Sequence, residues 1–321
     1  MSEEREFDVI IVGGGPAGIT AGIRCSSHNL STLLLEARKL GGQLTQLYPT
    51  KYVLDYSSHP DIRAGYLADL MVHHAREKGV RMAEGAQVRR IEPSKDGFIV
   101  TAGADRYGAK AVILAIGMGV FEPMRLGVEG EGRFEDKGVS YAVPNLEIYR
   151  GLKVLVVGGG DTAIENAIGL SQVARVTLAH RRDSFRATEA NVSILKRSLV
   201  QVLYDTEVTG ITGDERAKRA ALRDVRTGLA TEIDVDAVIV NIGFAPDLSL
   251  VKNLRVRNDG RHILVEDMGM GTNVPGIFAC GDIVDYAGKA RLIQPAAAEG
   301  VLATEGAHRH IAERRSRLAS E

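Results

Sequence analysis

The hydrophobic pattern at the start of the chain predicts a strand, a tight turn and a helix in succession. Residues 7–12 form a short, mostly apolar and β-branched run of the kind found in buried strands. The loop Gly13-Gly-Gly-Pro-Ala-Gly18 follows, and an alanine-rich stretch of helical character extends to about residue 28. A second apolar run, residues 31–35, ends on Glu36, which lies 23 positions after Gly13. The pattern therefore predicts a βαβ unit with an acidic residue at the end of its second strand.

The same pattern recurs without a gap when the chain is shifted by 145 positions. Residues 153–157 correspond to the first strand and residues 176–178 to the second. The glycine positions correspond in order, so that Gly13, Gly15 and Gly18 become Gly158, Gly160 and Ala163. At the end of the second strand, Arg181 stands where the first copy has Glu36, within His180-Arg-Arg-Asp-Ser-Phe-Arg186.

The two copies predict two phosphate-binding loops with different preferences. Glycines allow the backbone to approach a pyrophosphate, and the N-terminus of the following helix offers unpaired N–H groups to the anion. A carboxylate after the second strand binds a free ribose hydroxyl and repels a 2'-phosphate, whereas guanidinium groups bind that phosphate. Glu36 therefore suits the adenosine of FAD, and Arg181 suits NADP(H). The alternatives are a chance glycine turn and a solvated arginine turn, which the common register disfavours.

Two further apolar segments resemble each other and bracket the second copy. Residues 111–117 and 237–243 are both strand-like and end at a glycine. They predict two crossings between an outer domain, residues 1–116 and 245–321, and an inserted domain, residues 117–244. Gly117, Gly119 and Gly243 could act as hinges for a rotation of the inserted domain, and ordinary strand-end turns are the alternative.

The C-terminal part of the chain carries a third candidate region. Residues 272–282 predict a turn, a buried strand and a Gly281-Asp282 pair, in which Asp282 could bond a polyol such as the ribityl chain. A helix then opens at Ile293-Gln-Pro-Ala-Ala-Ala-Glu299, with Pro295 in the first turn, where proline is well tolerated. The positive end of this helix could stabilise negative charge on the pyrimidine of a reduced flavin.

Composition limits the class of protein. The 321 residues suffice for about two domains. Forty basic and 41 acidic residues give a formal net charge of -1, so no overall attraction to nucleic acid or an anionic membrane is expected. The acidic start is unlike a secretory signal, and the longest apolar run, residues 111–121, is broken by glycine and too short to span a bilayer. We therefore expect a cytoplasmic protein.

The only two cysteines, Cys25 and Cys280, lie far apart within apolar patterns. They cannot build a disulfide framework or a zinc site, and we expect two buried thiols and no metal.

Five motifs, in this order, resemble the thioredoxin reductase class of two-domain flavoproteins: Gly13-Gly-Gly-Pro-Ala-Gly18, Gly41-Gly-Gln-Leu44, Gly158-Gly-Gly-Asp-Thr-Ala163, His180-Arg-Arg-Asp-Ser-Phe-Arg186 and Gly276-Ile-Phe-Ala-Cys-Gly-Asp282. The resemblance runs over nearly the whole chain. It implies an α/β fold of two Rossmann-like three-layer domains, with the NADPH-binding domain inserted into the FAD-binding domain, and a homodimer.

The resemblance also assigns cofactor contacts. For FAD these are Gly13, Gly15, Pro16, Ala17, Gly18, Glu36, Gly42, Gln43, Tyr48, Gly117, Gly281, Asp282, Gln294, Pro295 and Ala296. For NADPH they are Gly158, Gly160, Asp161, Thr162, Ala163, His180, Arg181, Arg182 and Arg186.

The stretch Val139-Ser-Tyr-Ala-Val-Pro144 indicates the branch of this class. Thioredoxin reductases carry a Cys-x-x-Cys pair just ahead of the second nucleotide loop, where this chain has Tyr141-Ala-Val-Pro144. A dithiol relay is therefore excluded. Residues 41–52 are similar to the ferredoxin (or flavodoxin)-NADP reductases of thioredoxin-reductase type, which implies that Tyr48 stacks on the flavin. A core aromatic at a strand edge is the alternative for Tyr48.

One feature departs from that branch, which usually has a C-terminal extension over the second flavin face. This chain ends four residues after Arg317. We therefore expect room at that face for other electron acceptors.

The predicted activity is transfer of a hydride from NADPH to FAD, followed by single-electron transfer to ferredoxin or flavodoxin. Asp55 could relay a proton, although a carboxylate that accepts loop amides is the commoner case. Arg309, Arg314, Arg315 and Arg317 could offer a basic face to an acidic ferredoxin, or form a solvated helix end. The other hypotheses are a flavin reductase of quinones, ferric chelates or oxygen, and a redox-sensing flavoprotein with little turnover.

Overall fold

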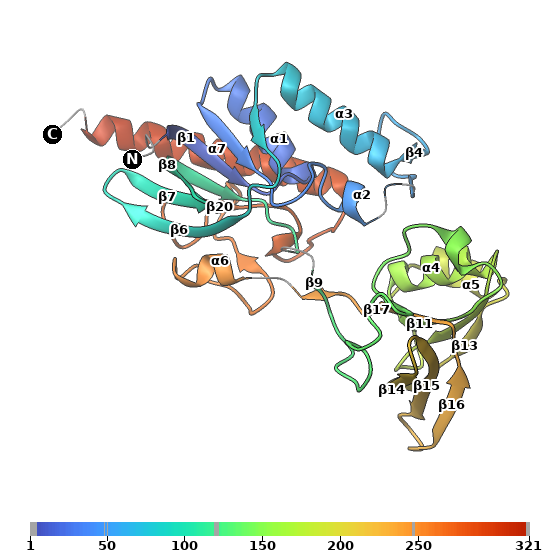
Figure 1. The fold of residues 1–321 in the computed structure, drawn as a ribbon. Coiled ribbons are helices and arrows are strands. Elements are labelled where there is room, and N and C mark those ends of the chain that lie inside the picture. Colours follow the sequence, from blue (N-terminus) through green and yellow to red (C-terminus); the bar gives the residue numbers. More distant parts are fainter. Residues whose placement is uncertain (1–4, 48, 50, 119–121, 246–247, 319–321) are drawn as a thin grey trace. The chain divides into compact units, whose positions relative to one another are not determined.

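The computed structural model describes residues 5–47, 49, 51–118, 122–245 and 248–318. The chain divides into two compact units, unit 1 with residues 1–121 and 246–321 and unit 2 with residues 122–245 (Figure 1). The division falls at 121/122 and 245/246, whereas the sequence predicted crossings at 116/117 and 244/245. Each unit has its own sheet and its own hydrophobic core.

Unit 1 contains most of the helices and the longer sheet. Its elements are β1 (Arg5–Val12), α1 (Pro16–Ser27), β2 (Thr32–Leu35), α2 (Gln43–Gln46), β3 (Tyr52–Val53), β4 (Ile62–Arg63), α3 (Ala64–Glu77), β5 (Arg81–Ala83), β6 (Val88–Ser94), β7 (Gly97–Ala102), β8 (Asp105–Leu114), α6 (Ser249–Lys252), β19 (Ile263–Leu264), β20 (Ile277–Ala279), η2 (Gly281–Ile283), β21 (Val284–Asp285) and α7 (Ile293–Leu318).

The sheet of unit 1 is ordered β5-β2-β1-β8-β7-β6, and β20 also pairs with β8. Strand β8 changes partner along its length. Residues 105–109 pair antiparallel with β7, and residues 112–114 pair parallel with β20. The central residues of β1, from Val9 to Ile11, are fully buried, as expected for a parallel strand covered on both faces.

The register of unit 1 brings four strand ends to one edge of the sheet. Val12 lies beside Leu35 of β2 and Leu114 of β8, and Leu114 lies beside Ala279 of β20. The segments that follow these strands therefore meet at the same edge, which is where parallel sheets bind their ligands.

Helices α1 and α7 lie side by side in unit 1 (Figure 1). The hydroxyl of Thr304 on α7 is fully buried and donates to the carbonyl of Ala21 on α1 or of Gly300 on α7, at 3.2 and 3.0 Å. Because α7 is held along α1, its N-terminal turns lie at the same sheet edge as the glycine loop.

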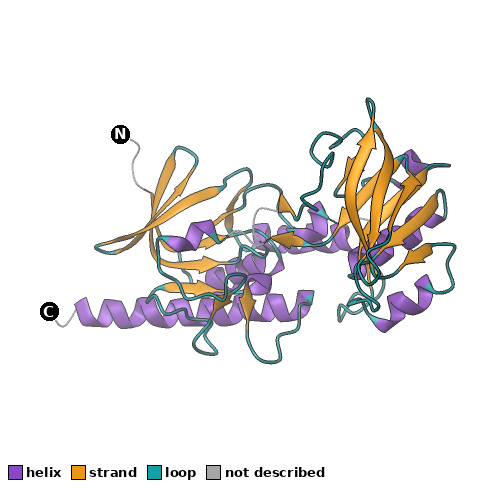
Figure 2. Ribbon diagram, turned by 90° about the horizontal axis from the view of Figure 1, so that it is seen from below, coloured by secondary structure: helices purple, strands orange, loops and turns teal. Residues whose placement is uncertain are grey.

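Unit 2 consists of the remaining elements: β9 (Glu122–Pro123), β10 (Val139–Ser140), η1 (Leu146–Tyr149), β11 (Lys153–Gly158), α4 (Asp161–Ser171), β12 (Arg175–Ala179), α5 (Glu189–Leu195), β13 (Gln201–Leu203), β14 (Thr206–Gly213), β15 (Ala217–Asp224), β16 (Ala230–Asp234), β17 (Ala237–Asn241) and β18 (Phe244–Ala245). Its parallel sheet is ordered β10-β17-β11-β12-β13, and β14-β15-β16 form a separate antiparallel sheet (Figure 2).

Unit 2 has three layers: helices α4 and α5, the parallel sheet and the antiparallel sheet. Alternate residues of β11, in the middle layer, pack against the two outer layers. Val154 and Val156 pack with side chains of α4 and α5, whereas Leu155 and Val157 pack with side chains of β14 and β15. Because successive side chains of a strand point to opposite faces, one apolar strand serves two cores. The predicted α/β fold with two Rossmann-like sheets is confirmed. Among the described residues, no helix is both long and apolar enough to cross a bilayer.

Candidate functional site

The first glycine loop of unit 1 has the backbone and the open space that a bound pyrophosphate requires. Gly13 has φ +108°, and a Cβ there would lie 2.2 Å from the carbonyl oxygen of Ala115, so only glycine fits. Gly15 is different, because a Cβ there would meet only Gly42 Cα, at 3.9 Å. Gly15 is also the N-cap of α1 and provides no side-chain cap, so the first N–H groups of α1 remain available to an anion.

Glu36 is held at this loop as the sequence predicted from its spacing. Its side chain is buried, and it accepts hydrogen bonds from the backbone N–H of Gly14 at 2.6 Å and of Arg38 at 2.8 Å. Each carboxylate oxygen thus has one donor and keeps lone pairs for a further donor, such as a ribose hydroxyl.

A second part of unit 1 reaches the same sheet edge from the C-terminal half of the chain. Gln43 Nε2 donates to Asp282 Oδ2 at 2.9 Å, which joins the start of α2 to the segment after β20. A Cβ on Gly281 would lie 3.1 Å from Ala17 Cβ in the first turn of α1. The structure therefore brings together Ala17, Gln43, Gly281 and Asp282, four of the residues that the resemblance assigns to FAD.

A buried ion pair, which was not predicted from the sequence, contacts Gly281. Lys289 and Glu299 form it, and each side chain is 2% exposed. Glu299 also accepts from the Gly281 N–H at 2.8 Å and from the Tyr286 hydroxyl at 2.6 Å. The only signal in the sequence is a glutamate among the small and apolar residues that open α7, which by itself does not identify a partner.

Asp55, Gln294 and Gly117 form no hydrogen bond with this cluster in the described part of the chain. Tyr48 is among the residues that the structure does not describe. Asp55 is exposed in the loop after β3. Gln294 donates to the hydroxyl of Ser57, so that the start of α7 contacts the loop that follows Asp55. Gly117 follows β8 with φ +57°, and a Cβ there would meet no atom within 4 Å.

The second glycine loop, in unit 2, repeats the geometry of the first. Gly158 has φ +154°, and a Cβ there would lie 2.2 Å from the carbonyl oxygen of Asn241. Gly160, the N-cap of α4, has no side-chain cap, and a Cβ there would meet no atom within 4 Å. The two copies of the sequence repeat therefore form glycine loops of similar geometry, each followed by a helix without a side-chain cap.

The arginine cluster lies at the end of β12, beside this loop. Arg181, Arg182 and Arg186 are all exposed, and within the described residues none of their side chains has a hydrogen-bond or ion-pair partner. The backbone N–H of Arg186 donates to the Gly159 carbonyl at 2.9 Å. Unpaired guanidinium groups tied to a phosphate-binding loop suit a 2'-phosphate.

His180 and Asp161 shape this site from within. The His180 ring is buried, stacks on Phe185 at 5.0 Å and makes a 2.9 Å hydrogen bond with the Ser184 carbonyl, to which its Nε2 donates. Asp161 Oδ1 accepts from Thr188 N and Asn191 Nδ2, at 2.9 and 2.7 Å, and so joins α4 to α5. Both side chains hold the arginine segment in place.

Tyr141 stands where thioredoxin reductases carry their redox pair, and it is a structural residue here. Its hydroxyl donates to Glu131 Oε1 at 3.0 Å, and Arg125 Nη1 donates to the same hydroxyl at 3.1 Å. Glu131 is buried and also accepts from the backbone N–H of Leu126 and Gly127. Burial and the bond to Glu131 raise the pKa of Tyr141 to about 12.

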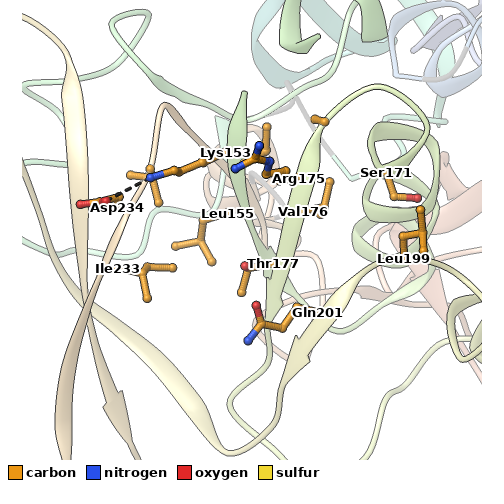
Figure 3. Close-up of a pocket in the computed structure, with 13 residues that line it drawn as sticks. Lys153, Leu155, Ser171, Arg175, Val176, Thr177, Leu199, Gln201, Ile233 and Asp234 are labelled. Carbon is orange, nitrogen blue, oxygen red and sulfur yellow. Dashed lines mark hydrogen bonds and ion pairs between the residues drawn. The ribbon is translucent and has the colours of Figure 1, made fainter. Parts of the chain in front are cut away.

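Unit 2 also contains a cavity of about 400 Å³, which is distinct from the nucleotide loop (Figure 3). It lies at the amino ends of β11, β12 and β13, where Lys153, Arg175 and Gln201 line it. The loop of Gly158 follows the carboxyl end of β11. Because parallel sheets bind nucleotides at their carboxyl ends, this cavity is not the dinucleotide site.

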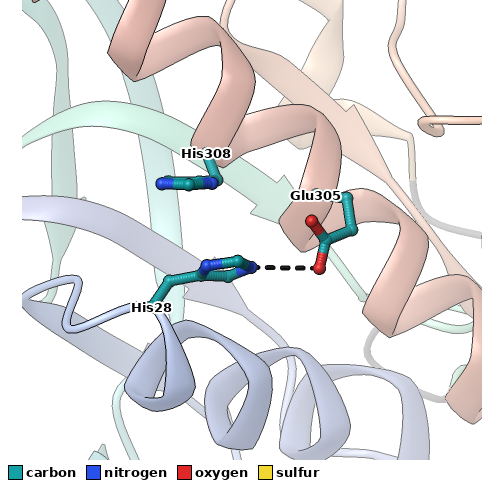
Figure 4. Close-up of side chains that lie close together, drawn as sticks. All are labelled: His28, Glu305 and His308. Atoms are coloured by element: carbon teal, nitrogen blue, oxygen red, sulfur yellow. Dashed lines mark hydrogen bonds and ion pairs between the residues drawn. The ribbon is translucent and has the colours of Figure 1, made fainter.

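His28, Glu305 and His308 form a cluster between α1 and α7, with ligand-type atoms within 4.8 Å of one another (Figure 4). The two imidazole rings are stacked at 4.1 Å, and His28 Nε2 lies 3.0 Å from Glu305 Oε1. The same carboxylate oxygen binds Arg24 at 2.6 Å. This cluster ties the two helices together through an ion pair.

The predicted basic face on α7 is partly occupied. Arg315 donates to Asp8 at 3.0 Å, and Arg314 donates to the carbonyl of Lys95 at 2.7 Å. Two of the four arginines thus bind other segments of unit 1, whereas the sequence offered only a basic face or a solvated helix end.

Comparisons with known proteins agree with this geometry. The family described as "Pyridine nucleotide-disulphide oxidoreductase" matches residues 7–300. The chain is 36% identical over 318 residues to "Ferredoxin--NADP reductase 2" of Shouchella clausii, covering 97% of this chain and 96% of that protein. It is 38% identical over 307 residues to "Ferredoxin--NADP reductase" of Thermus thermophilus, covering 94% and 91%.

Solved structures of thioredoxin reductases share the fold. That of Lactococcus lactis has a TM-score of 0.88 and 30% identity, covering 96% of this chain and 99% of that one. That of T. acidophilum has a TM-score of 0.86 and 30% identity, covering 95% and 99%.

Proposed function

Because the chain belongs to the pyridine nucleotide-disulphide oxidoreductase family, and within it to the thioredoxin-reductase-like ferredoxin–NADP reductases, we propose that it transfers electrons from NADPH through bound FAD to ferredoxin or flavodoxin. It is an oxidoreductase, and the family implies binding of FAD and NAD(P). The proposal concerns the assignment of the two sites, the choice of NADPH and the acceptor.

The observation that carries the proposal is the contrast between the two glycine loops. One has a buried carboxylate, Glu36, bonded to its backbone, and the other has unpaired guanidinium groups at the corresponding strand end, where Arg181 stands. A free ribose hydroxyl suits the first site, and a 2'-phosphate suits the second.

FAD fits the residues of unit 1. The open space over Gly15 and the uncapped start of α1 suit a pyrophosphate, and Glu36 suits the adenosine ribose. Asp282 keeps one carboxylate oxygen beyond its bond to Gln43, which suits a ribityl hydroxyl. When bound, the flavin supplies the chemistry that this function needs, because it accepts a hydride and releases electrons one at a time.

NADPH fits the residues of unit 2. The uncapped start of α4 suits its pyrophosphate, and the exposed guanidinium groups of Arg181, Arg182 and Arg186 suit its 2'-phosphate. His180 and Asp161, which the resemblance also assigns to NADPH, hold this site through bonds to Ser184 and to Asn191 of α5.

The proposed electron transfer to the acceptor uses no thiol of this protein. Cys25 and Cys280 are both buried in the core of unit 1, and the position of the redox pair is occupied by Tyr141 with its bond to Glu131. This favours an acceptor that takes electrons from the flavin itself.

The proposal is tested by NADPH-driven reduction of cytochrome c as ferredoxin, and separately flavodoxin, is titrated into the purified protein. A rate that saturates with the carrier and is absent without it supports the proposal. A rate that is independent of the carrier supports a reductase of small acceptors, and flavin reduction without turnover supports a sensor. The homodimer that the resemblance implied is tested by sedimentation of the holoprotein.

A further inference from the structure

The ion pair between Lys289 and Glu299 is the most deeply buried charge pair among the described residues, and nothing in the proposed electron transfer requires it to be there. Both side chains are 2% exposed, while every other ion pair in the described part of the chain includes a more exposed side chain. Replacement of a buried ion pair by well-packed apolar side chains of similar volume is often neutral or stabilising. Stability of the fold alone therefore does not account for two charges at this place.

The contacts of the pair converge on one backbone residue. Gly281 donates its N–H to Glu299 Oε2 at 2.8 Å, and its carbonyl accepts from Lys289 Nζ at 3.1 Å. Glu299 Oε1 binds Lys289 and the Tyr286 hydroxyl. The pair thus forms hydrogen bonds with both the N–H and the carbonyl of Gly281, and apolar side chains could form neither bond.

The network around Glu299 is fully connected. Its bond to Tyr286, together with burial, raises the pKa of that phenol to about 12. Lys289 also lies 5.4 Å from the centroid of the Tyr286 ring. These contacts fix the orientation of the carboxylate that holds Gly281.

Gly281 in turn links the segments that form the candidate FAD site. It has φ +80°, and a Cβ there would lie 3.1 Å from Ala17 Cβ in the first turn of α1, while its neighbour Asp282 binds Gln43. A shift of Gly281 would therefore displace Asp282, the predicted partner of the ribityl chain, and would disturb the packing against the first turn of α1.

We propose that Lys289, Glu299 and Tyr286 form a positioning device that holds Gly281 and Asp282 in the geometry that binds FAD. The pair acts through the backbone of Gly281 and does not touch the cofactor. This inference rests on the proposed assignment of FAD to unit 1.

The test compares four variants by FAD affinity and by thermal stability. Glu299→Gln and Lys289→Met each break the pair, Lys289→Met with Glu299→Leu replaces it by apolar side chains, and Tyr286→Phe removes one hydrogen bond without leaving a buried charge unpaired. Holoprotein of each variant is diluted in steps, and released FAD is measured by its fluorescence. Unfolding of the same samples is followed by far-UV circular dichroism.

A matched control comes from unit 2. Glu131 is also a buried carboxylate that accepts from backbone N–H groups and from a tyrosine hydroxyl. Glu131→Gln perturbs the same chemistry in the unit that does not carry the candidate FAD site. We expect it to lower thermal stability without changing the FAD dissociation constant.

We expect the apolar double variant to fold with a lowered melting temperature, because the N–H and the carbonyl of Gly281 lose their partners. It should bind FAD about ten- to a hundredfold more weakly, by analogy with the range seen at metal sites when hydrogen-bond partners of the ligands are removed. Tyr286→Phe should weaken FAD binding in the same direction and by less. A double variant that regains both wild-type stability and wild-type FAD affinity would overturn the proposal, because the pair would then serve the fold alone.

Loss of folding in a single variant does not affect this comparison, since the double variant and Tyr286→Phe leave no buried charge unpaired. The outcome is also independent of the electron acceptor. A wild-type protein that binds FAD but ignores ferredoxin and flavodoxin contradicts the proposed function and leaves the test of the ion pair intact.

Discussion

Replacement of Arg181 by glutamate should reverse the nucleotide preference of unit 2. The unbroken offset of 145 positions predicts that Arg181 takes the place of Glu36, but the strand register corrects this by one residue. Val12 pairs with Leu35 and Val157 pairs with Ala179, so His180 occupies the position of Glu36 and Arg181 follows it. In unit 1, Glu36 is bonded to the glycine loop through Gly14. Arg181→Glu therefore puts a carboxylate one residue beyond the position of Glu36, where it would repel a 2'-phosphate.

The expected magnitude follows from the exposure of the cluster. Hydrogen bonds to charged groups contribute about 1.5–3 kcal/mol each, and an exposed site such as this belongs at the lower end of that range. About 1.4 kcal/mol corresponds to a tenfold change in affinity. We expect Arg181→Ala to raise the KM for NADPH about tenfold, and Arg181→Glu to raise it further because the carboxylate repels the 2'-phosphate.

Steady-state reduction of ferricyanide with NADPH and with NADH measures the effect. The KM for NADH should change little in Arg181→Ala, because NADH has no 2'-phosphate. Arg197→Ala is the matched control, since Arg197 is an exposed arginine of unit 2 that bonds the Ser193 carbonyl. Equal changes in the KM values of NADPH and NADH would refute the assignment of the cluster to the 2'-phosphate.

Three further predictions concern groups elsewhere in the chain. Burial disfavours the ionised carboxylate of Asp8, but hydrogen bonds from Lys110 and Ser31 outweigh this effect and hold the pKa of Asp8 below its usual value. Asp8→Asn should therefore lower the melting temperature at pH 7, and the difference from the wild type should shrink as the pH falls below about 4. Thermal scans from pH 7 to pH 3 measure this difference. Burial raises the pKa of Cys25 to about 11 and also raises the pKa of Cys280, so both thiols should resist Ellman's reagent in the native protein and react in guanidinium chloride; rapid native labelling would contradict their burial. Tyr141→Phe should lower the free energy of unfolding by about 1 kcal/mol through the lost hydrogen bond to a buried carboxylate, with ferredoxin-dependent turnover retained; loss of turnover at unchanged stability would instead give Tyr141 a role in electron transfer.

The local pattern of the sequence determined the two nucleotide-binding units. Strand β1, helix α1 and strand β2 begin and end within about two residues of their predicted positions, and so does the second copy in β11 and β12. This works because β-branched runs, glycine turns and alanine-rich helices express their preferences within a few residues. The change from an acidic to a basic segment after the second strand could be recognised for the same reason, although the strand register places His180, and not Arg181, at the position of Glu36.

The structure decided what covers the sheets and what supports the sites. The antiparallel layer of β14, β15 and β16 packs against the second face of β11, yet its sequence has no signal that names this partner. The arginines of α7 looked free in the sequence, and Arg315 turned out to bind Asp8, which lies 307 positions away.

The buried pair of Lys289 and Glu299 shows the limit most clearly. Spacing along a helix or strand indicates which residues share a face. Whether a charged side chain is buried and paired depends on segments that are distant in the sequence and pack around it in the folded chain. Sequence alone therefore determined the chemistry that could bind the two nucleotides. Only the tertiary structure decided which residues hold that chemistry in place, because burial and long-range contact exist only in the folded chain.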